Sequence, residues 1–280
     1  MSIYVSTGKF GDYCVLDTVR SFHDQGITSI EISCGKVCET DLAALKKIKK
    51  TGVNFRLHNY FPNLAQDFVL NLASASPEIR KKSRTLIHDA LRWSAELESN
   101  YYAFHAGFLL NIIPAELGGN LQATNLLSRE DALQIFREEL FGIKCFADTL
   151  NVDISVENNV YDFNNYKKFG SKIPFLGVCE NDISEILVDG VGLLLDFGHL
   201  KVSANVLGLD PLEIFDNWSQ YITGYHLSDN NGFVDQNKSF DLDSWFMRKI
   251  TDFKLPITLE VFDLSFDELR LLVTRLEEID

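Results

Sequence analysis

The feature that most constrains the fold is a regular alternation of short β-rich runs with longer amphipathic stretches. The β-rich runs cover residues 2–6, 29–33, 53–59, 101–106, 152–158, 191–197, 221–228 and 256–261. The amphipathic stretches, which have helical periodicity, cover residues 15–25, 40–51, 77–99, 128–150, 182–188, 211–219, 243–253 and 266–279. Strands that alternate with helices in this way build parallel sheets that are covered by the helices.

Eight such units follow one another without a linker-like break, which favours a closed barrel over an open sheet. Ser76 precedes Pro77, and Asp210 precedes Pro211, so two helices have a capping residue followed by a proline suited to the first turn. We therefore predict an α/β fold, with residues 1–280 forming one (β/α)8 barrel domain. The long loop at 111–128 follows the fourth strand, on the expected active-site face, and could act as a lid.

Composition limits the compartment and the partners. The net charge is −14, whereas proteins that grip duplex nucleic acid usually present a basic face, so nucleic acid is not an expected partner. We expect neither a signal peptide nor a membrane span, because the chain begins without a basic segment and has no long apolar run. The five cysteines are odd in number and scattered, which argues against a disulfide framework and favours the cytoplasm. The role of Cys34 and Cys38 and the formation of a homo-oligomer stay open.

Ionisable residues gather where the predicted strands end. Six of them lie within the last three positions of a strand: His58, His105, Glu157, Asp196, His226 and Glu260. His199 follows three residues after Asp196. Acids that converge on one barrel mouth repel one another unless a positive charge lies among them, and a divalent cation accepts both carboxylate and imidazole ligands.

Each of these residues has an ordinary alternative reading. A single histidine at a strand end is commonly a hydrogen-bonded structural residue, and a single carboxylate there commonly caps the next helix. His23 and His88 fall within helical stretches, and we expect both to be structural. The recurrence at six strand ends favours a metal site for the other residues.

The motifs LHNYFPN, AFHAG, SVENN, LLLDFGHLK, YHLSDNNG and ITLEV occur in this order along the chain. In order and spacing they resemble the xylose isomerase-like TIM barrels, a superfamily that contains sugar-phosphate isomerases and epimerases as well as apurinic endonucleases of the endonuclease IV type. The resemblance spans nearly the whole chain. Its most specific parts are the DxGH element from Asp196 to His199 and the acidic ends of the fifth and eighth strands.

The resemblance implies a divalent metal, which could be Mn, Zn, Co or Mg. Its ligands would be Glu157, Asp196, His226 and Glu260. In the isomerase and epimerase branch, the catalytic residues would be Glu157 and Glu260, which also move protons on opposite faces of the substrate carbon. His199 would contact the substrate, a sugar or small polyol.

The endonuclease branch implies a second metal, held by His58 and His105 with Glu157 as the bridging ligand. In a one-metal enzyme His58 and His105 would instead line the substrate pocket. The segment at 68–83 looks especially like the endonuclease branch. That branch places a third metal on a histidine matching His199 and on a following Asp-x-His, but here the last residue is Asn237, which offers only a neutral oxygen.

Two further differences from the patterns of the two branches concern the substrate. The loop after the second strand, CGKVCET, lacks the arginine-bearing DNA-penetrating pattern of the endonucleases. The arginine that epimerases place shortly after the strand-seven histidine is also missing, since Gly232 and Phe233 occupy that stretch.

Three hypotheses follow. The preferred one is a metal-dependent isomerase or epimerase of a sugar, sugar phosphate or similar hydroxy-carbonyl compound, which moves a proton beside a metal-bound carbonyl. The second is a metal-dependent phosphoester hydrolase, at its sharpest an abasic-site endonuclease. The third is a barrel that keeps the metal site but serves only as a binding protein, and the intact ligand positions make it the weakest.

Overall fold

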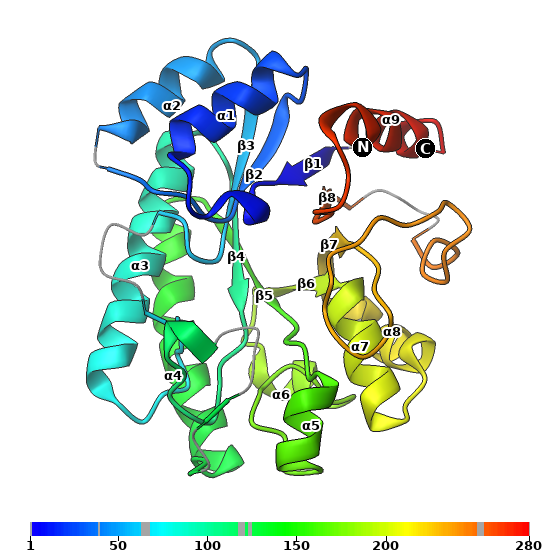
Figure 1. Ribbon diagram of the computed structural model, residues 1–280. Coiled ribbons are helices and arrows are strands. Elements are labelled where there is room, and N and C mark those ends of the chain that lie inside the picture. The colour runs from blue at the N-terminus through cyan, green and yellow to red at the C-terminus, as the bar shows by residue number, and fades with distance from the viewer. Residues whose placement is uncertain are drawn as a thin grey trace.

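Eight parallel strands close into a barrel in the computed structural model, which describes residues 2–38, 40–62, 68–116, 121–122, 125–250 and 255–279. The strands neighbour one another in chain order, and β8 closes the barrel by pairing with β1 (Figure 1). They are β1 (Ile3–Ser6), β2 (Ser29–Ile32), β3 (Asn54–His58), β4 (Tyr101–His105), β5 (Asp153–Glu157), β6 (Gly192–Asp196), β7 (Ile222–Leu227) and β8 (Ile257–Leu259). The predicted (β/α)8 barrel is confirmed.

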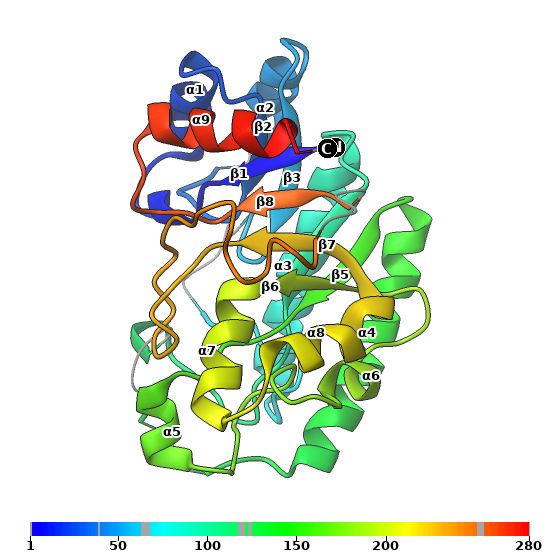
Figure 2. The ribbon, with the colours of Figure 1, turned by 90° about the vertical axis from the view of Figure 1, so that its right-hand side faces the viewer.

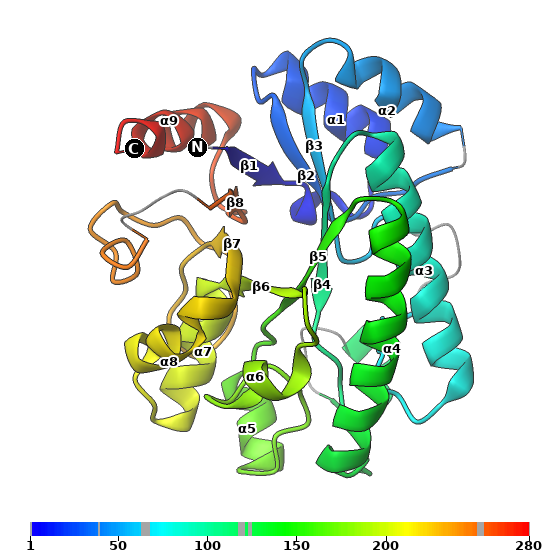
Figure 3. The same ribbon diagram turned by 180° about the vertical axis from the view of Figure 1, so that it is seen from behind.

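Helices surround the barrel. They are α1 (Val15–Asp24), α2 (Asp41–Lys49), α3 (Pro77–Glu96), α4 (Arg129–Thr149), α5 (Phe163–Phe169), α6 (Asp182–Ile186), α7 (Phe197–Leu207), α8 (Pro211–Trp218) and α9 (Phe266–Glu277), with short 3-10 turns at Gly8–Phe10, Pro114–Glu116 and Ser219–Tyr221. The long helices α3 and α4 run side by side outside β4 and β5 (Figure 3). Strands β1, β8, β7 and β6 lie next to one another, with α7 and α8 outside β6 and β7 (Figure 2).

The strands are apolar toward the helices and polar toward the barrel axis. Outward-facing Ile30, Leu57 and Leu195 are fully buried in the core between strands and helices, as expected for a parallel sheet covered on its outer face. The barrel interior contains charged residues instead, among them Glu31 and Arg56, which pair in register on β2 and β3. The interior is therefore where buried charges must find partners.

Helix starts follow the signals in the sequence. The Ser76 side chain accepts a hydrogen bond from the Ile79 backbone at the start of α3, and Asp210 accepts one from Leu212 at the start of α8. Helix α9 begins with a full capping box between Ser265 and Glu268. Such caps satisfy backbone donors that the first helical turn leaves without partners.

The structure corrects two expectations. The predicted helix over 243–253 is wrong for its described residues, because residues 243–249 form successive turns. Here Phe246 is fully buried and stacks on Phe197 at 5.0 Å between ring centroids, so packing overrides the helical pattern. The pattern also missed two helices, α5 in the loop after β5 and α7 directly after β6.

The loop at 111–128 contains the 3-10 turn Pro114–Glu116, and its residues 117–120 and 123–124 fall outside the described residues, so its role as a lid stays a prediction. No helix among the described residues has the length and apolarity to cross a membrane.

Candidate metal centre

The ends of six strands bring the ionisable residues to one mouth of the barrel. His58, His105, Glu157 and Asp196 are the last residues of β3, β4, β5 and β6, His226 is next to last in β7, and Glu260 directly follows β8. The strand register places two pairs of them side by side, because His105 pairs with Glu157 and Asp196 pairs with His226. Glu157, Asp196 and His226 are fully buried.

Four of these residues surround one position. His226 Nδ1 lies 3.2 Å from Glu260 Oε2, 3.3 Å from Glu157 Oε1 and 3.8 Å from Asp196 Oδ2. The donor atoms of all four lie within 4.8 Å of one another. Glu157 Oε1, Asp196 Oδ2 and His226 Nδ1 are buried and have no hydrogen-bond partner. Buried polar atoms of this kind are costly unless something binds them, and this mixture of oxygen and nitrogen ligands fits a divalent cation.

The DxGH element fixes Asp196. Its Oδ1 caps α7 by accepting a hydrogen bond of 2.7 Å from the His199 backbone, which leaves Oδ2 turned toward His226. The Asn158 side chain donates to the Asp196 carbonyl and accepts from the Asp196 amide, at 3.0 and 2.8 Å. Asp196 is thus both a helix cap and a candidate ligand, held by backbone bonds on two sides.

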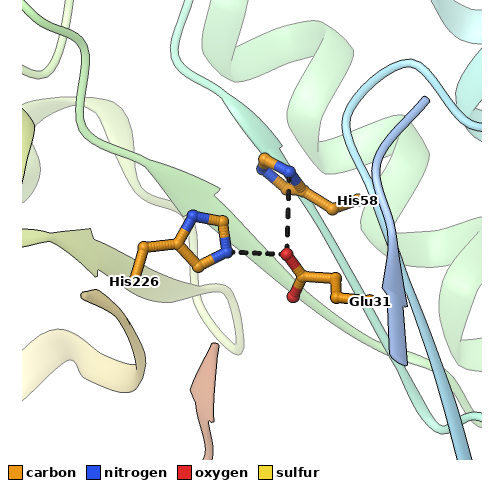
Figure 4. A group of neighbouring side chains, drawn as sticks. All are labelled: Glu31, His58 and His226. Carbon is orange, nitrogen blue, oxygen red and sulfur yellow. Dashed lines mark ion pairs between the residues drawn. The ribbon is translucent and has the colours of Figure 1, made fainter. Parts of the chain in front are cut away.

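Glu31 is the site residue that the sequence analysis missed. It lies on β2, is fully buried, and its carboxylate sits between the rings of His58 and His226 (Figure 4). Glu31 Oε1 is 2.8 Å from His226 Nε2 and 3.9 Å from His58 Nδ1. The 2.8 Å contact is an ion pair without hydrogen-bond alignment, since neither atom has a hydrogen-bond partner. Thr258 Oγ1 donates to Glu31 Oε2 at 2.8 Å.

The sequence carried a signal for Glu31. A single acid stands inside the apolar run SIEIS of the second predicted strand. Such a residue faces the barrel interior, because its neighbours on both sides are apolar and face the helices.

A second cluster lies beside the four-residue group. The donor atoms of His105, Glu157 and His199 lie within 4.8 Å of one another, whereas His58 groups with Glu31 and His226. His58 Nε2 and His105 Nδ1 are still 2.8 and 3.3 Å from the same oxygen, Glu157 Oε2. The endonuclease resemblance implied a second metal held by His58, His105 and Glu157. These three residues lie close together, but His105 and Glu157 belong to one group of candidate ligands and His58 belongs to another.

His199 is oriented by two partners. Its Nδ1 contacts the Asn158 carbonyl at 2.9 Å, and its Nε2 lies 3.4 Å from Asp235 Oδ2. Asn237, in the third-metal element of the endonuclease pattern, accepts a hydrogen bond from Ser228 at 3.5 Å through its side chain.

The pKa values reflect this crowding in the metal-free protein. Burial alone would lower the pKa of His226, but the carboxylates of Glu31, Glu157 and Glu260 outweigh it and raise the pKa well above its usual value. Burial would raise the pKa of Glu31, yet His226 and His58 lower it to about 2. Positive histidines and negative acids therefore stabilise one another.

Three further residues of the site also have pKa values that are shifted from their usual values. Burial raises the pKa of Asp196 to about 7, with His199 opposing the shift. Burial lowers the pKa of His105 to about 4, against the effect of Glu157. The pKa of His199 is raised well above its usual value, because Asp196 and Asp235 outweigh the effect of burial.

A cavity of about 220 Å³ opens beside the second cluster. His105, His199 and Asp235 form its polar end, and Phe108 and Phe175 form part of an apolar wall. It is large enough for a small organic molecule next to the candidate ligands.

The protein is a parallel (β/α)8 barrel whose strand ends carry a buried set of residues of metal-ligand types. In barrels of this class the functional site lies at the C-terminal ends of the strands. Residues 23–273 match the family model described as xylose isomerase-like TIM barrel. The chain therefore belongs to the xylose isomerase-like TIM barrel family.

Similar proteins share the fold. An uncharacterized protein of Methanocaldococcus jannaschii is 24% identical over 293 residues, covering 100% of this chain and 99% of the relative. Among solved structures, a D-tagatose 3-epimerase-like protein is 18% identical with a TM-score of 0.74 and covers 100% of this chain and 98% of its own.

Two more solved structures represent different activities. D-psicose 3-epimerase with D-tagatose, from Clostridium cellulolyticum, is 12% identical with a TM-score of 0.64, covering 92% of this chain and 84% of its own. Endonuclease IV from Thermus thermophilus is 16% identical with a TM-score of 0.60, covering 99% of this chain and 100% of its own. At these identities the likeness shows the fold, and the neighbours include both sugar epimerases and an endonuclease IV.

Proposed function

We propose that the protein is a divalent-metal-dependent isomerase or epimerase that moves a proton at a carbon beside a carbonyl of a hydroxy-carbonyl substrate. The observation that carries the proposal is the group of Glu157, Asp196, His226 and Glu260, in which two glutamates approach one position from β5 and from the end of β8. Two carboxylates that reach one site from different strands can serve two faces of a substrate carbon.

The ion, held by these four residues, would act as a Lewis acid on the substrate carbonyl and its neighbouring hydroxyl. One of the two glutamates takes the proton from the carbon, and the other returns it or serves the opposite face. A general base must be ionised, and the histidines around Glu157 hold the pKa of that carboxyl well below its usual range, although burial opposes them.

His105 and His199, which line the cavity, bind substrate in this proposal, whereas His58 lies against Glu157 and Glu31 and is not a lining residue. The lowered pKa of His105 makes this ring neutral at pH 7, so it can accept a hydrogen bond from a substrate hydroxyl. The raised pKa of His199 makes its ring a donor. Substrate hydroxyls could therefore be oriented by an acceptor and a donor side by side.

The second candidate function is an endonuclease IV-like phosphoester hydrolase. It is favoured by the cluster of His105, Glu157 and His199, which could hold a second ion. Two observations count against it: Asn237 replaces the histidine of a third site, and the net charge of −14 repels a polyanion.

Solvent exchange tests the proposal. Metal-loaded protein is incubated in D2O with a panel of ketoses and aldoses, and NMR follows deuterium at the carbon beside the carbonyl. The proposal predicts incorporation with formation of an epimer or isomer, and Glu260→Gln should lower the rate by about 10²–10⁴-fold. No incorporation from any sugar, together with metal-dependent cleavage of bis(p-nitrophenyl) phosphate, would favour the hydrolase instead.

A further inference from the structure

The cavity beside the metal centre has two unlike ends. Its apolar wall consists of Phe108, Ile112, Leu121 and Phe175, whose exposed fractions are between 3% and 8%. These residues belong to a small hydrophobic cluster that is separate from the main core. An apolar wall that faces a cavity offers burial to an apolar part of a ligand.

The polar end of the cavity offers mostly acceptors. Asn59 Oδ1 and Asp235 Oδ1 are buried without a hydrogen-bond partner, and both residues line the cavity. Asn59 is 8% exposed, so its amide oxygen is a buried acceptor next to His105 and His199. Hydroxyl groups of a polyol would satisfy such acceptors.

The described lining of the cavity contains no lysine or arginine but three acids, Glu116, Asp162 and Asp235. The segments 63–67, 117–120 and 123–124, which the structure does not describe, also contain no basic residue in their sequences. Lys168 is not a lining residue, although its Nζ lies next to the wall, where it donates to the carbonyls of Leu121 and Gln122. A phosphate dianion in this cavity would meet these three carboxylates, and among the described lining residues only the protonated His199 ring would offset them, which is unfavourable.

We infer that the substrate is an unphosphorylated hydroxy-carbonyl compound that carries a compact apolar substituent, with the substituent against the Phe108–Phe175 wall. This inference rests on the proposed isomerase function. It narrows the substrate class of that function, because neither a sugar phosphate nor an unsubstituted sugar has an apolar group to pack against the apolar wall. Each buried methylene should raise affinity roughly fourfold, which corresponds to about 0.8 kcal/mol.

Binding of matched ligands tests the inference without requiring turnover. The probes are D-glucitol, D-glucitol 6-phosphate and 6-O-butyl-D-glucitol, titrated calorimetrically into metal-loaded protein. We expect the butyl ether to bind at least tenfold more tightly than D-glucitol and the phosphate to bind more weakly than either. Equal or weaker binding of the butyl ether, including no binding, or preference for the phosphate, overturns the inference.

The corresponding ketoses separate this inference from the proposed function. If D-fructose, its 6-phosphate and its 6-O-butyl ether all fail to exchange deuterium while the butyl ligand binds best, the isomerase proposal fails and the shape of the pocket is still as inferred. If deuterium exchange is fastest with D-fructose 6-phosphate, the isomerase proposal is supported and the inference of a substrate with an apolar substituent is wrong.

Two adjacent isoleucines provide a matched pair of variants. Ile112 is 8% exposed and lines the cavity, whereas Ile113 is 59% exposed and does not. Ile112→Lys should abolish the preference for the butyl ether and increase affinity for the phosphate at least tenfold, while Ile113→Lys should change neither. If Ile112→Lys does not fold, the milder change Ile112→Ser takes its place. It should reduce the preference for the butyl ether and leave the affinity for the phosphate unchanged. Identical behaviour of the variants at 112 and 113 in folded protein contradicts the inference.

Discussion

Glu31 and His226 form a buried ion pair behind the candidate metal centre. Glu31 Oε1 lies 2.8 Å from His226 Nε2, so the other ring nitrogen, Nδ1, faces Glu157, Asp196 and Glu260. A carboxylate behind a ligating histidine orients the ring and raises its basicity. This role is what the missed residue adds to the site.

Glu31→Gln should therefore weaken the binding of a divalent ion about 10–100-fold, although residue 31 is not one of the four candidate ligands. Competition with a chromophoric chelator measures the affinity. Glu78→Gln is the matched control, because Glu78 is exposed on α3 and should leave affinity unchanged. Equal affinity of the Glu31→Gln and unaltered proteins would show that the ion pair serves only the fold.

Binding of the ion should release protons. The pKa of His226 lies well above its usual value in the metal-free protein, so at pH 7 the ring is protonated and must lose a proton before Nδ1 can bind an ion. Asp196, with its pKa raised to about 7, is partly protonated at the same pH. Apparent affinity should thus rise from pH 6 to pH 8.

Calorimetry in buffers of different ionisation enthalpy measures this release. The expected result at pH 7 is about one proton or more for each ion bound. A binding heat that does not depend on the buffer would mean that the ion avoids His226.

At the scale of elements, the start of α7 couples the helix to the site. A Cβ on Gly198 would lie 2.6 Å from Ser228 Oγ and 3.2 Å from Asp196 Oδ1. Ser228 is buried and Asp196 is held by two backbone bonds, so neither can move without loss. The glycine of the DxGH element is therefore required by close approach to the end of β7.

Gly198→Ala should weaken metal binding roughly tenfold by displacing Asp196. The matched control is Gly142→Ala in α4, where a Cβ meets nothing within 4 Å. That change should leave metal binding unaltered and raise the free energy of unfolding by about 0.5–1 kcal/mol, since alanine is favoured over glycine inside a helix. Urea unfolding and chelator competition on both variants provide the measurement, and normal metal affinity in folded Gly198→Ala would contradict this reading.

Elements whose pattern is local could be predicted from the sequence, and elements decided by packing could not. The strand ends carrying His58, Glu157 and Asp196 follow from apolar runs that stop at an ionisable residue. The turns at 243–249 depend on the contact of Phe246 with Phe197, which is distant in sequence. The acid inside the run SIEIS marked Glu31 as an interior residue, but its role at the site could not be predicted, because its partners lie on β3 and β7.

At the scale of the whole molecule, barrel closure makes the site. Thr258 and Glu31 are 227 residues apart in sequence and share a hydrogen bond, because β8 pairs with β1 and β1 pairs with β2. The second cluster, in contrast, comes from the adjacent strands β4 and β5 and from the start of α7, directly after β6. The resemblance to the endonuclease branch implied a group of His58, His105 and Glu157, whereas the structure groups His199 with His105 and Glu157.

The charge of the molecule sets its response to nucleic acid. With a net charge of −14, the protein should bind a duplex containing an abasic site weakly at physiological salt. A gel assay with Mn²⁺ or Zn²⁺ should detect no incision above that of a Glu157→Gln control. Robust, metal-dependent incision that the Glu157→Gln variant abolishes would promote the hydrolase over the isomerase.

The number and position of bound ions test the central claim most directly. Elemental analysis of protein purified without added metal, followed by anomalous diffraction from its crystals, gives both quantities. The account predicts one divalent ion for each chain, about 2.0–2.6 Å from donor atoms of Glu157, Asp196, His226 and Glu260, and retained in His58→Ala. Two or more ions for each chain, with one bound at His105 and lost in His58→Ala, would contradict it.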